Sequence, residues 1–278
     1  MGAQAKVEGV VMRRRPLGEA DDIVTFLSPT RGRFDAVARG VRKSRKATAG
    51  RLEPFTHVRL LLAAGRGLDV VGQVEVMRAR TGLVNDLDRI ARAFCVLELY
   101  DHIGEASAGE RLFRTLLRAL DELETADPDL ASRRAELRLL TVLGCAPHLE
   151  TCVQCQAATD LSSFSPQSGG VLCSACATQH SRVRRLSPGG RALLLSLRSP
   201  GIDEATRWWS EFTPGMRLEV EGLLASHLDW HWPQRVRSRG FLDDLRAAAV
   251  TPGAPSRPTS PAPEHAASGG TVRPGDTP

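Results

Sequence analysis

Two pairs of cysteines carry the most specific chemical signal in this sequence. Cys152 and Cys155 form one C-x-x-C pair, seventeen residues follow, and Cys173 and Cys176 form the second pair. Two such pairs at this separation are typical of a tetrahedral site with four thiolate ligands, in which each pair contributes one knuckle. We therefore predict one structural Zn²⁺ per chain, in preference to a bare thiol cluster or an iron–sulfur cluster. Four thiolates close the coordination shell, so we do not expect catalysis at the metal.

A nucleobase-modifying zinc enzyme is the alternative for these cysteines. His148 and Glu150 form an H-x-E pattern, and a C-x-x-C pair follows at 173–176, as in zinc deaminases. However, Leu172 stands before that pair where the deaminase pattern has proline, and the first cysteine pair would then have no role. No alternation of strands and helices surrounds the pattern. A deaminase-like enzyme is therefore the weaker hypothesis.

A second group of side chains, between residues 39 and 55, could bind phosphates. Six cations lie within thirteen residues, and only Glu53 offsets them. The residues between Lys43 and Gly50 include nothing large and apolar, so we expect a mobile, solvated loop between two strands. Such a loop can hold a nucleic-acid backbone without reading bases, whereas the alternative is a charged hairpin that only aids solubility. The six cations are Arg39, Arg42, Lys43, Arg45, Lys46 and Arg51.

The charge of the chain supports this interpretation. Residues 1–80 contain 16 Lys/Arg and 8 Asp/Glu, a balance of +8, whereas the remainder contains 21 and 24, a balance of −3. The triplet Arg13, Arg14 and Arg15 adds to this positive field, and we expect it at the end of the first strand, on the same face as the loop. No stretch approaches twenty apolar residues and the N-terminus lacks the apolar core of a signal peptide, so we expect a cytoplasmic protein.

The elements that must position these groups fall into two types. Five short β-like runs separated by glycine and proline predict a small barrel over residues 1–80, of the oligonucleotide-binding (OB) type, with an SH3-like barrel as the alternative. The runs are Val7–Met12, Ile23–Leu27, Phe34–Ala38, His57–Leu62 and Val70–Val76.

Helical periodicity replaces the strand pattern over residues 81–250, so the fold class is α+β. The zinc module, at 150–178, is an insertion that includes a small hairpin between the cysteine pairs. Beyond Thr251 the composition predicts a disordered tail. The expected helices run from Leu83 to Ile103, Gly109 to Leu123, Pro128 to Leu143, Pro188 to Leu197, Pro214 to Leu228 and Arg239 to Val250.

Several stretches, taken in order, resemble the RecO family of bacterial DNA-repair and recombination mediators. They are A-R-G-V-R-K-S…G-R-L-E-P-F at 38–55, L-R-L-L-T-V-L-G-C at 137–145, the C-x-x-C and F-S-P-Q-S-G-G-V-L-C-S-A-C run at 152–176, and R-V-R-S-R-G-F-L at 235–242. The resemblance covers about residues 5–247. It implies an OB barrel on a helical domain with a zinc module. It also implies binding of single- and double-stranded DNA, strand annealing, and loading of the recombinase RecA. The implied partners are RecR and the acidic C-terminal tail of the single-strand-binding protein.

The residues themselves favour a non-enzymatic DNA-binding protein. Annealing needs no bond chemistry, because a protein that neutralises phosphates on two strands lowers their repulsion. Phe26, Phe34 and Phe55 are the only Phe, Tyr or Trp residues in the first 80 positions, so we expect base stacking there to be minor. A pure protein adaptor is a further alternative. The four tryptophans are expected in the core or on a partner surface: Trp208, Trp209, Trp230 and Trp232.

Overall fold

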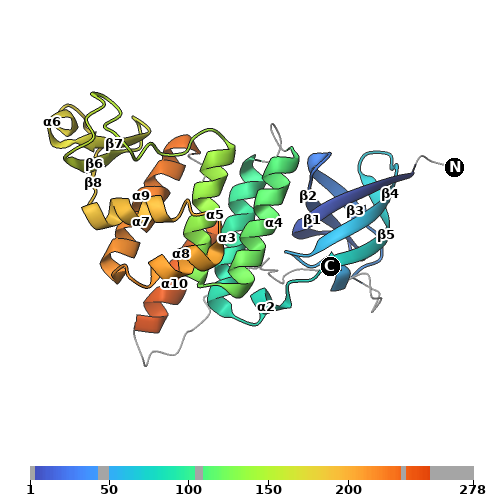
Figure 1. Cartoon of the computed structure of the whole chain (residues 1–278). Coiled ribbons are helices and arrows are strands. Elements are labelled where there is room, and N and C mark those ends of the chain that lie inside the picture. Colours follow the sequence, from blue (N-terminus) through green and yellow to red (C-terminus); the bar gives the residue numbers. More distant parts are fainter. Residues whose placement is uncertain (1–3, 43–49, 104–108, 233–235, 251–278) are drawn as a thin grey trace, which may run out of the picture.

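The computed structural model describes residues 4–42, 50–103, 109–232 and 236–250. A β-barrel lies at one end of the molecule, a group of helices in the middle, and a small module of strands and one short helix at the other end (Figure 1). The predicted α+β class is confirmed. Lys43, Arg45, Lys46 and the tail from Thr251 to Pro278 lie outside the described residues.

Five strands close the N-terminal barrel in the order β1-β2-β3-β5-β4. β1 pairs with β2 on one side and with β4 on the other, and β3 pairs in parallel with β5. This connectivity is that of an OB-type barrel, as predicted. The strands are β1 (Gln4–Leu17), β2 (Asp21–Ser28), β3 (Gly32–Ala38), β4 (His57–Ala63) and β5 (Asp69–Arg78).

The barrel interior follows from the alternation of side chains along each strand. Val11, Val24, Phe26 and Leu60 are fully or almost fully buried there. β1 extends to Leu17, five residues beyond the predicted end, because it pairs with β2 as far as Asp21. The arginine triplet consequently lies within the strand rather than at its end.

The segment between β3 and β4 is a crossover and not a hairpin, since β5 lies between these two strands in the barrel. A simple charged hairpin, the alternative interpretation of the cationic segment, does not fit this topology. Backbone bonds fix both ends of the segment: Arg42 N donates to Ala20 O at 3.0 Å, and Phe55 N donates to Val11 O at 3.0 Å.

Side-chain caps mark the starts of three of the predicted helices. The Asp127 side chain accepts from the backbone of Asp129 and Leu130 at the start of α5, and Ser187 and Thr213 cap α7 and α9 in the same way. The predicted helix from Leu83 is divided, and α8 was not predicted. The helices are α2 (Thr81–Val84), α3 (Leu87–Ile103), α4 (Glu110–Thr125), α5 (Pro128–Val142), α7 (Pro188–Ser196), α8 (Ile202–Trp209), α9 (Pro214–His231) and α10 (Arg237–Val250).

A buried charge network lies inside the helical domain, between α4 and α5. Arg134, with no exposed surface, donates to Glu122 at 3.1 Å and to Leu197 O at 3.0 Å. Arg138 donates to the same carboxylate at 2.6 and 2.8 Å. Burial raises the pKa of Glu122, but the two arginines outweigh burial and the net pKa is lowered. The network therefore joins α4, α5 and the end of α7.

Ion pairs and a buried arginine dock the barrel against the helices. Arg33 of β3 lies 2.5 Å from Asp101 of α3. Arg80, almost fully buried, donates to Phe55 O at 2.8 Å and to Asp121 of α4 at 2.9 Å. These contacts position the barrel on α3 and α4.

The distal module contains β6 (Leu161–Ser165), β7 (Gly170–Cys173), α6 (Ser174–Ala177) and β8 (Arg184–Arg185), with strand order β7-β6-β8. The antiparallel β6–β7 pair is the predicted hairpin. Among the helices that the structure describes, none has the length and apolar character needed to cross a membrane.

Candidate nucleic-acid interface and metal centre

The four predicted metal ligands converge at one point of the distal module. The sulfur atoms of Cys152, Cys155, Cys173 and Cys176 all lie within 4.8 Å of one another. Cys155 Sγ and Cys173 Sγ, one from each pair, are 3.7 Å apart. A tetrahedron of Zn–S bonds of about 2.3 Å places its sulfur atoms about 3.8 Å apart, so the geometry fits Zn²⁺.

Local backbone geometry forms the two knuckles. In the first, Gln156 N donates to Cys152 O at 2.9 Å, and Gln156 adopts a φ of 62°, which turns the chain back. In the second, Cys173 ends β7 and is the N-cap of α6, which carries Cys176. The hairpin thus brings the second pair to the first.

Hydrogen bonds within the cluster spread the pKa values of its thiols. Burial raises the pKa of Cys152, but backbone N–H groups of Cys155, Cys173 and Gln154 outweigh it and lower this pKa to about 6. A hydrogen bond with Cys173, together with burial, raises the pKa of Cys176 to about 12. A metal that binds all four as thiolates must displace the remaining protons, so its affinity rises with pH.

The H-x-E residues of the deaminase alternative do not join this cluster. His148 Nε2 lies 2.8 Å from Thr151 Oγ1, and Glu150 pairs with Arg198. Within the described residues, the group of potential metal ligands contains the four cysteines and no histidine. The structure therefore does not reproduce the ligand set of a zinc deaminase.

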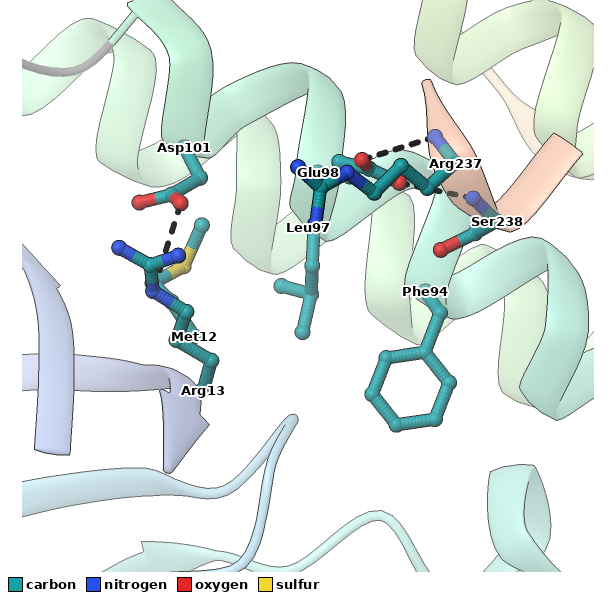
Figure 2. Close-up of a pocket in the computed structure, with 8 residues that line it drawn as sticks. All are labelled: Met12, Arg13, Phe94, Leu97, Glu98, Asp101, Arg237 and Ser238. Carbon is teal, nitrogen blue, oxygen red and sulfur yellow. Dashed lines mark hydrogen bonds and ion pairs between the residues drawn. The ribbon is translucent and has the colours of Figure 1, made fainter. Parts of the chain in front are cut away.

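Arg13 and Arg15 of the β1 triplet lie beside carboxylates. Arg13 Nε lies 3.3 Å from Thr25 Oγ1 and 3.6 Å from Asp101 Oδ2, and Figure 2 shows its guanidinium directed toward Asp101. Arg15 Nη2 lies 2.8 Å from Asp35 Oδ2. Part of the charge of these two arginines is therefore offset within the protein.

Arg14 projects from the opposite face of β1, because successive side chains of a strand alternate. Arg14 Nη2 lies 2.6 Å from Asp22 Oδ2, and Nη1 pairs with Glu53. Arg14 thus contacts Glu53 of the segment at 39–55, whereas Arg13 and Arg15 lie on the other face of the strand. Each arginine of the triplet has a carboxylate partner.

The arginines at the two ends of the β3–β4 connection have a different environment. Arg39 is exposed and has no hydrogen-bond or ion-pair partner in the part of the chain that the structure describes. Arg42 donates to Gly18 O at 2.8 Å and Arg51 to Val74 O at 3.2 Å, both carbonyl oxygens. A carbonyl positions a guanidinium without neutralising it. Within the residues that the structure describes, no carboxylate therefore offsets the charge of these three arginines.

The aromatic residues of the barrel offer little surface for base stacking. Phe26 and Phe55 are buried, and Phe34 stacks on Phe26 with 5.3 Å between ring centroids. The guanidinium of Arg31 lies over the Phe34 ring, 4.6 Å from its centroid. The barrel surface can therefore contact a backbone but has few faces for bases.

Two family models match consecutive parts of this chain. The model described as Recombination protein O N terminal matches residues 1–80, and the one described as Recombination protein O C terminal matches residues 84–240. The chain belongs to the RecO family. The resemblance seen in the sequence motifs is thereby confirmed.

Curated RecO relatives are similar over most of their length. Proteins named DNA repair protein RecO from Roseiflexus sp. (strain RS-1) and Thermobifida fusca (strain YX) are 38% and 37% identical to this chain. The matches cover 87% of the chain and 86% of the first relative, and 85% of the chain and 97% of the second. A third, from Anaeromyxobacter dehalogenans, is 35% identical over 87% of the chain and 97% of the relative. This chain is thus a RecO-family DNA repair protein.

Some features of the RecO site are not visible in the sequence alone. The carboxylates that pair with the triplet come from β2, β3 and α3 and from Glu53, so no local pattern reveals them. Asp101 lies 88 positions after Arg13 in the sequence, and its carboxylate forms ion pairs with both Arg13 and Arg33. No local signal placed the triplet away from a turn, because β1 continues past Met12 only through its pairing with β2.

Proposed function

We propose that this RecO-family protein binds the backbones of single- and double-stranded DNA through the ends of its β3–β4 connection. The observation that carries the proposal is that Arg39, Arg42 and Arg51 have no carboxylate partner within the described residues. Cations that keep their charge attract phosphates and release counterions from the strand. We assign a role in the same binding to Lys43, Arg45 and Lys46, which lie between these ends in the sequence and outside the described residues.

The β1 triplet contributes less to this surface. A phosphate must compete with Asp101 for Arg13, with Asp22 and Glu53 for Arg14, and with Asp35 for Arg15. The cost of separating an existing ion pair offsets part of the gain from a new one. We therefore rank the loop-end arginines above the triplet.

The activity that follows is annealing without covalent chemistry. Neutralising phosphates on two strands lowers their repulsion, and base pairing then completes the reaction. The four cysteines would hold Zn²⁺ as a structural ion, because four thiolates leave no coordination position for water or substrate. Family membership further supports action with RecR and the tail of the single-strand-binding protein, which would help load RecA onto single strands.

Annealing of two complementary labelled strands tests the proposal. The variant Arg39→Ala/Arg42→Ala/Arg51→Ala should anneal more slowly than the wild type. A control variant, Arg15→Ala/Arg31→Ala/Arg59→Ala, removes the same formal charge from arginines that pair with Asp35, Asp69 and Glu75. Equal annealing rates for the two variants would place the activity elsewhere.

A further inference from the structure

A long segment that spans much of the distal module and α7 carries positive charge without any acidic residue. Between Asp160 and Asp203 the chain has five arginines and no Asp or Glu. Three of them, Arg182, Arg184 and Arg185, are exposed, and none pairs with a carboxylate in the described ranges. This run of arginines contrasts with the rest of the helical domain, whose formal net charge is negative.

Two of these arginines line a groove between the module and α9. The groove has a volume of about 350 Å³, with Arg182, Val183 and Arg184 from the module and Ser226 and Trp230 from α9. β8 pairs with β6 through Arg184 and Phe164, which fixes the backbone on the module side.

The guanidinium of Arg184 lies close to α9 at Gly222. A Cβ atom at Gly222 would lie 3.4 Å from Arg184 Nη2, so the bare backbone of α9 leaves room for the guanidinium. Asp229 also lines the groove, but Arg239 Nη1 lies 3.6 Å from its carboxylate. The groove therefore keeps a net positive charge.

Trp230 gives the groove an aromatic surface. Trp230 is 43% exposed to solvent, whereas Trp209 is buried and Trp232 packs against the core. Val183, also exposed, adds a second apolar contact. An exposed indole beside unpaired arginines offers both groups that single-stranded nucleic acid requires, a stacking face for a base and cations for phosphates.

We propose that this groove is a second binding site, specific for single-stranded nucleic acid. Arg182 and Arg184 contact consecutive phosphates and Trp230 stacks on an unpaired base. An acidic peptide would satisfy the arginines equally, but it would leave the indole face without a partner of matching shape. The proposal deepens the proposed function and rests on it, since it adds a site to a protein already assigned to DNA.

The position of the groove gives it a role in annealing. Figure 1 shows the module with β6, β7 and β8 at the end of the molecule opposite the barrel. One chain therefore presents two separate nucleic-acid surfaces, the barrel for backbones of either form and the groove for unpaired bases. Two strands, or two segments of one strand, can then be held by a single chain.

The test uses full-length protein that already carries Arg39→Ala/Arg42→Ala/Arg51→Ala, so that the barrel contributes less to the remaining binding. In this background Trp230→Ala should weaken binding of an oligo-dT strand by about 5-fold or more, the range expected for the loss of one stacked base. Affinity for a duplex of the same length should change less than about twofold, because paired bases are not available to stack. Trp208→Ala is the matched control, since Trp208 is 46% exposed and lies outside the groove.

Photocrosslinking of wild-type protein gives a second measurement that does not depend on a variant. An oligonucleotide with 5-iododeoxyuridine should crosslink to Trp230, as read by mass spectrometry of the peptides. Unchanged oligo-dT affinity in Trp230→Ala, or crosslinks confined to the barrel, would contradict nucleic-acid binding in the groove. Neither result would count against binding by the barrel. Crosslinks at Trp230 with none in the barrel would support the groove and count against the proposed function.

An acidic peptide provides the remaining comparison. If Arg182→Ala/Arg184→Ala, made in the same background, binds oligo-dT normally but loses a Glu-rich octapeptide, the groove is a protein-docking surface and our proposal is wrong. If the variant loses oligo-dT with a shallower salt dependence, the proposal is supported.

Discussion

Arg14 of β1 donates to Asp22 of the neighbouring strand β2, with Nη2 and Oδ2 2.6 Å apart. This ion pair is an example of one of two environments in which arginines occur in the barrel of this RecO-family protein. Arginines within the sheet have carboxylate partners from neighbouring elements, whereas those at the ends of the β3–β4 connection have only carbonyl contacts or none in the described residues. Among the described arginines of the barrel, those at the ends of the β3–β4 connection are therefore available to an anionic ligand without first leaving a carboxylate.

Loss of one cysteine should remove the metal and lower stability without abolishing DNA binding. Purified wild-type protein should contain one zinc per chain, and Cys173→Ser should lose it and melt at a lower temperature, because metal binding contributes folding energy. Metal analysis and thermal melting measure both effects. Cys95→Ala is the control and should keep its zinc, since Cys95 packs against the helical core away from the cluster. A metal-free wild type whose four thiols all react in the native state would contradict the assignment.

Glu122→Gln should destabilise the helical domain by about 3–5 kcal/mol, because it leaves the buried charge of Arg134 without a full partner. Urea unfolding measures the change. Glu110→Gln, which removes the exposed partner of Arg114, should cost less than about 1 kcal/mol. Equal losses of unfolding free energy in the two variants would show that burial does not strengthen the contribution of the network to stability.

The same carboxylate gives a pH dependence with a defined sign. The pKa of Glu122 is lower in the folded protein than its usual value of 4.5, so the unfolded chain takes up the proton first. The contribution of ionised Glu122 to the free energy of unfolding is therefore complete above pH 4.5, and it is lost as the pH falls through the lowered pKa. The stability difference between wild type and Glu122→Gln should narrow on acidification below pH 4.5. A difference that widens there would mean that the arginines do not stabilise the carboxylate.

Removal of residues 251–278 should leave folding and DNA binding nearly unchanged. This segment has little apolar side-chain surface to bury, and it contains two Arg against one Glu and one Asp. Thermal melting and oligonucleotide binding of the truncated chain measure the effect. A large fall in melting temperature would show that the tail docks on the folded protein.

Local signals in the sequence were sufficient for most elements. Turn residues between apolar runs predicted the barrel strands, and Asp127 and Ser187, each followed by proline, predicted where α5 and α7 begin. The cysteine spacing predicted the cluster because short-range knuckles and one hairpin determine its geometry.

The surroundings of the arginines could not be predicted in the same way. Arg13, Arg14 and Arg15 are adjacent in sequence, but strand alternation places them on two faces. Their partners come from the neighbouring strand (Asp22) and from further along the chain (Asp35, Glu53 and Asp101). The groove at Trp230 likewise forms only when the module packs beside α9. Charge content is therefore readable from sequence, whereas neutralisation of that charge depends on tertiary contacts.

The salt dependence of single-strand binding tests the central claim most directly. For single strands, removing one phosphate contact flattens the plot of log affinity against log salt by about 0.7, so Arg39→Ala/Arg42→Ala/Arg51→Ala should reduce the slope by roughly 1.4–2. The control Arg15→Ala/Arg31→Ala/Arg59→Ala, with the same formal charge, should keep a slope close to that of the wild type. A well-folded loop-end variant with an unaltered slope, or a control whose slope falls as much, would contradict the assignment of DNA binding to the β3–β4 connection.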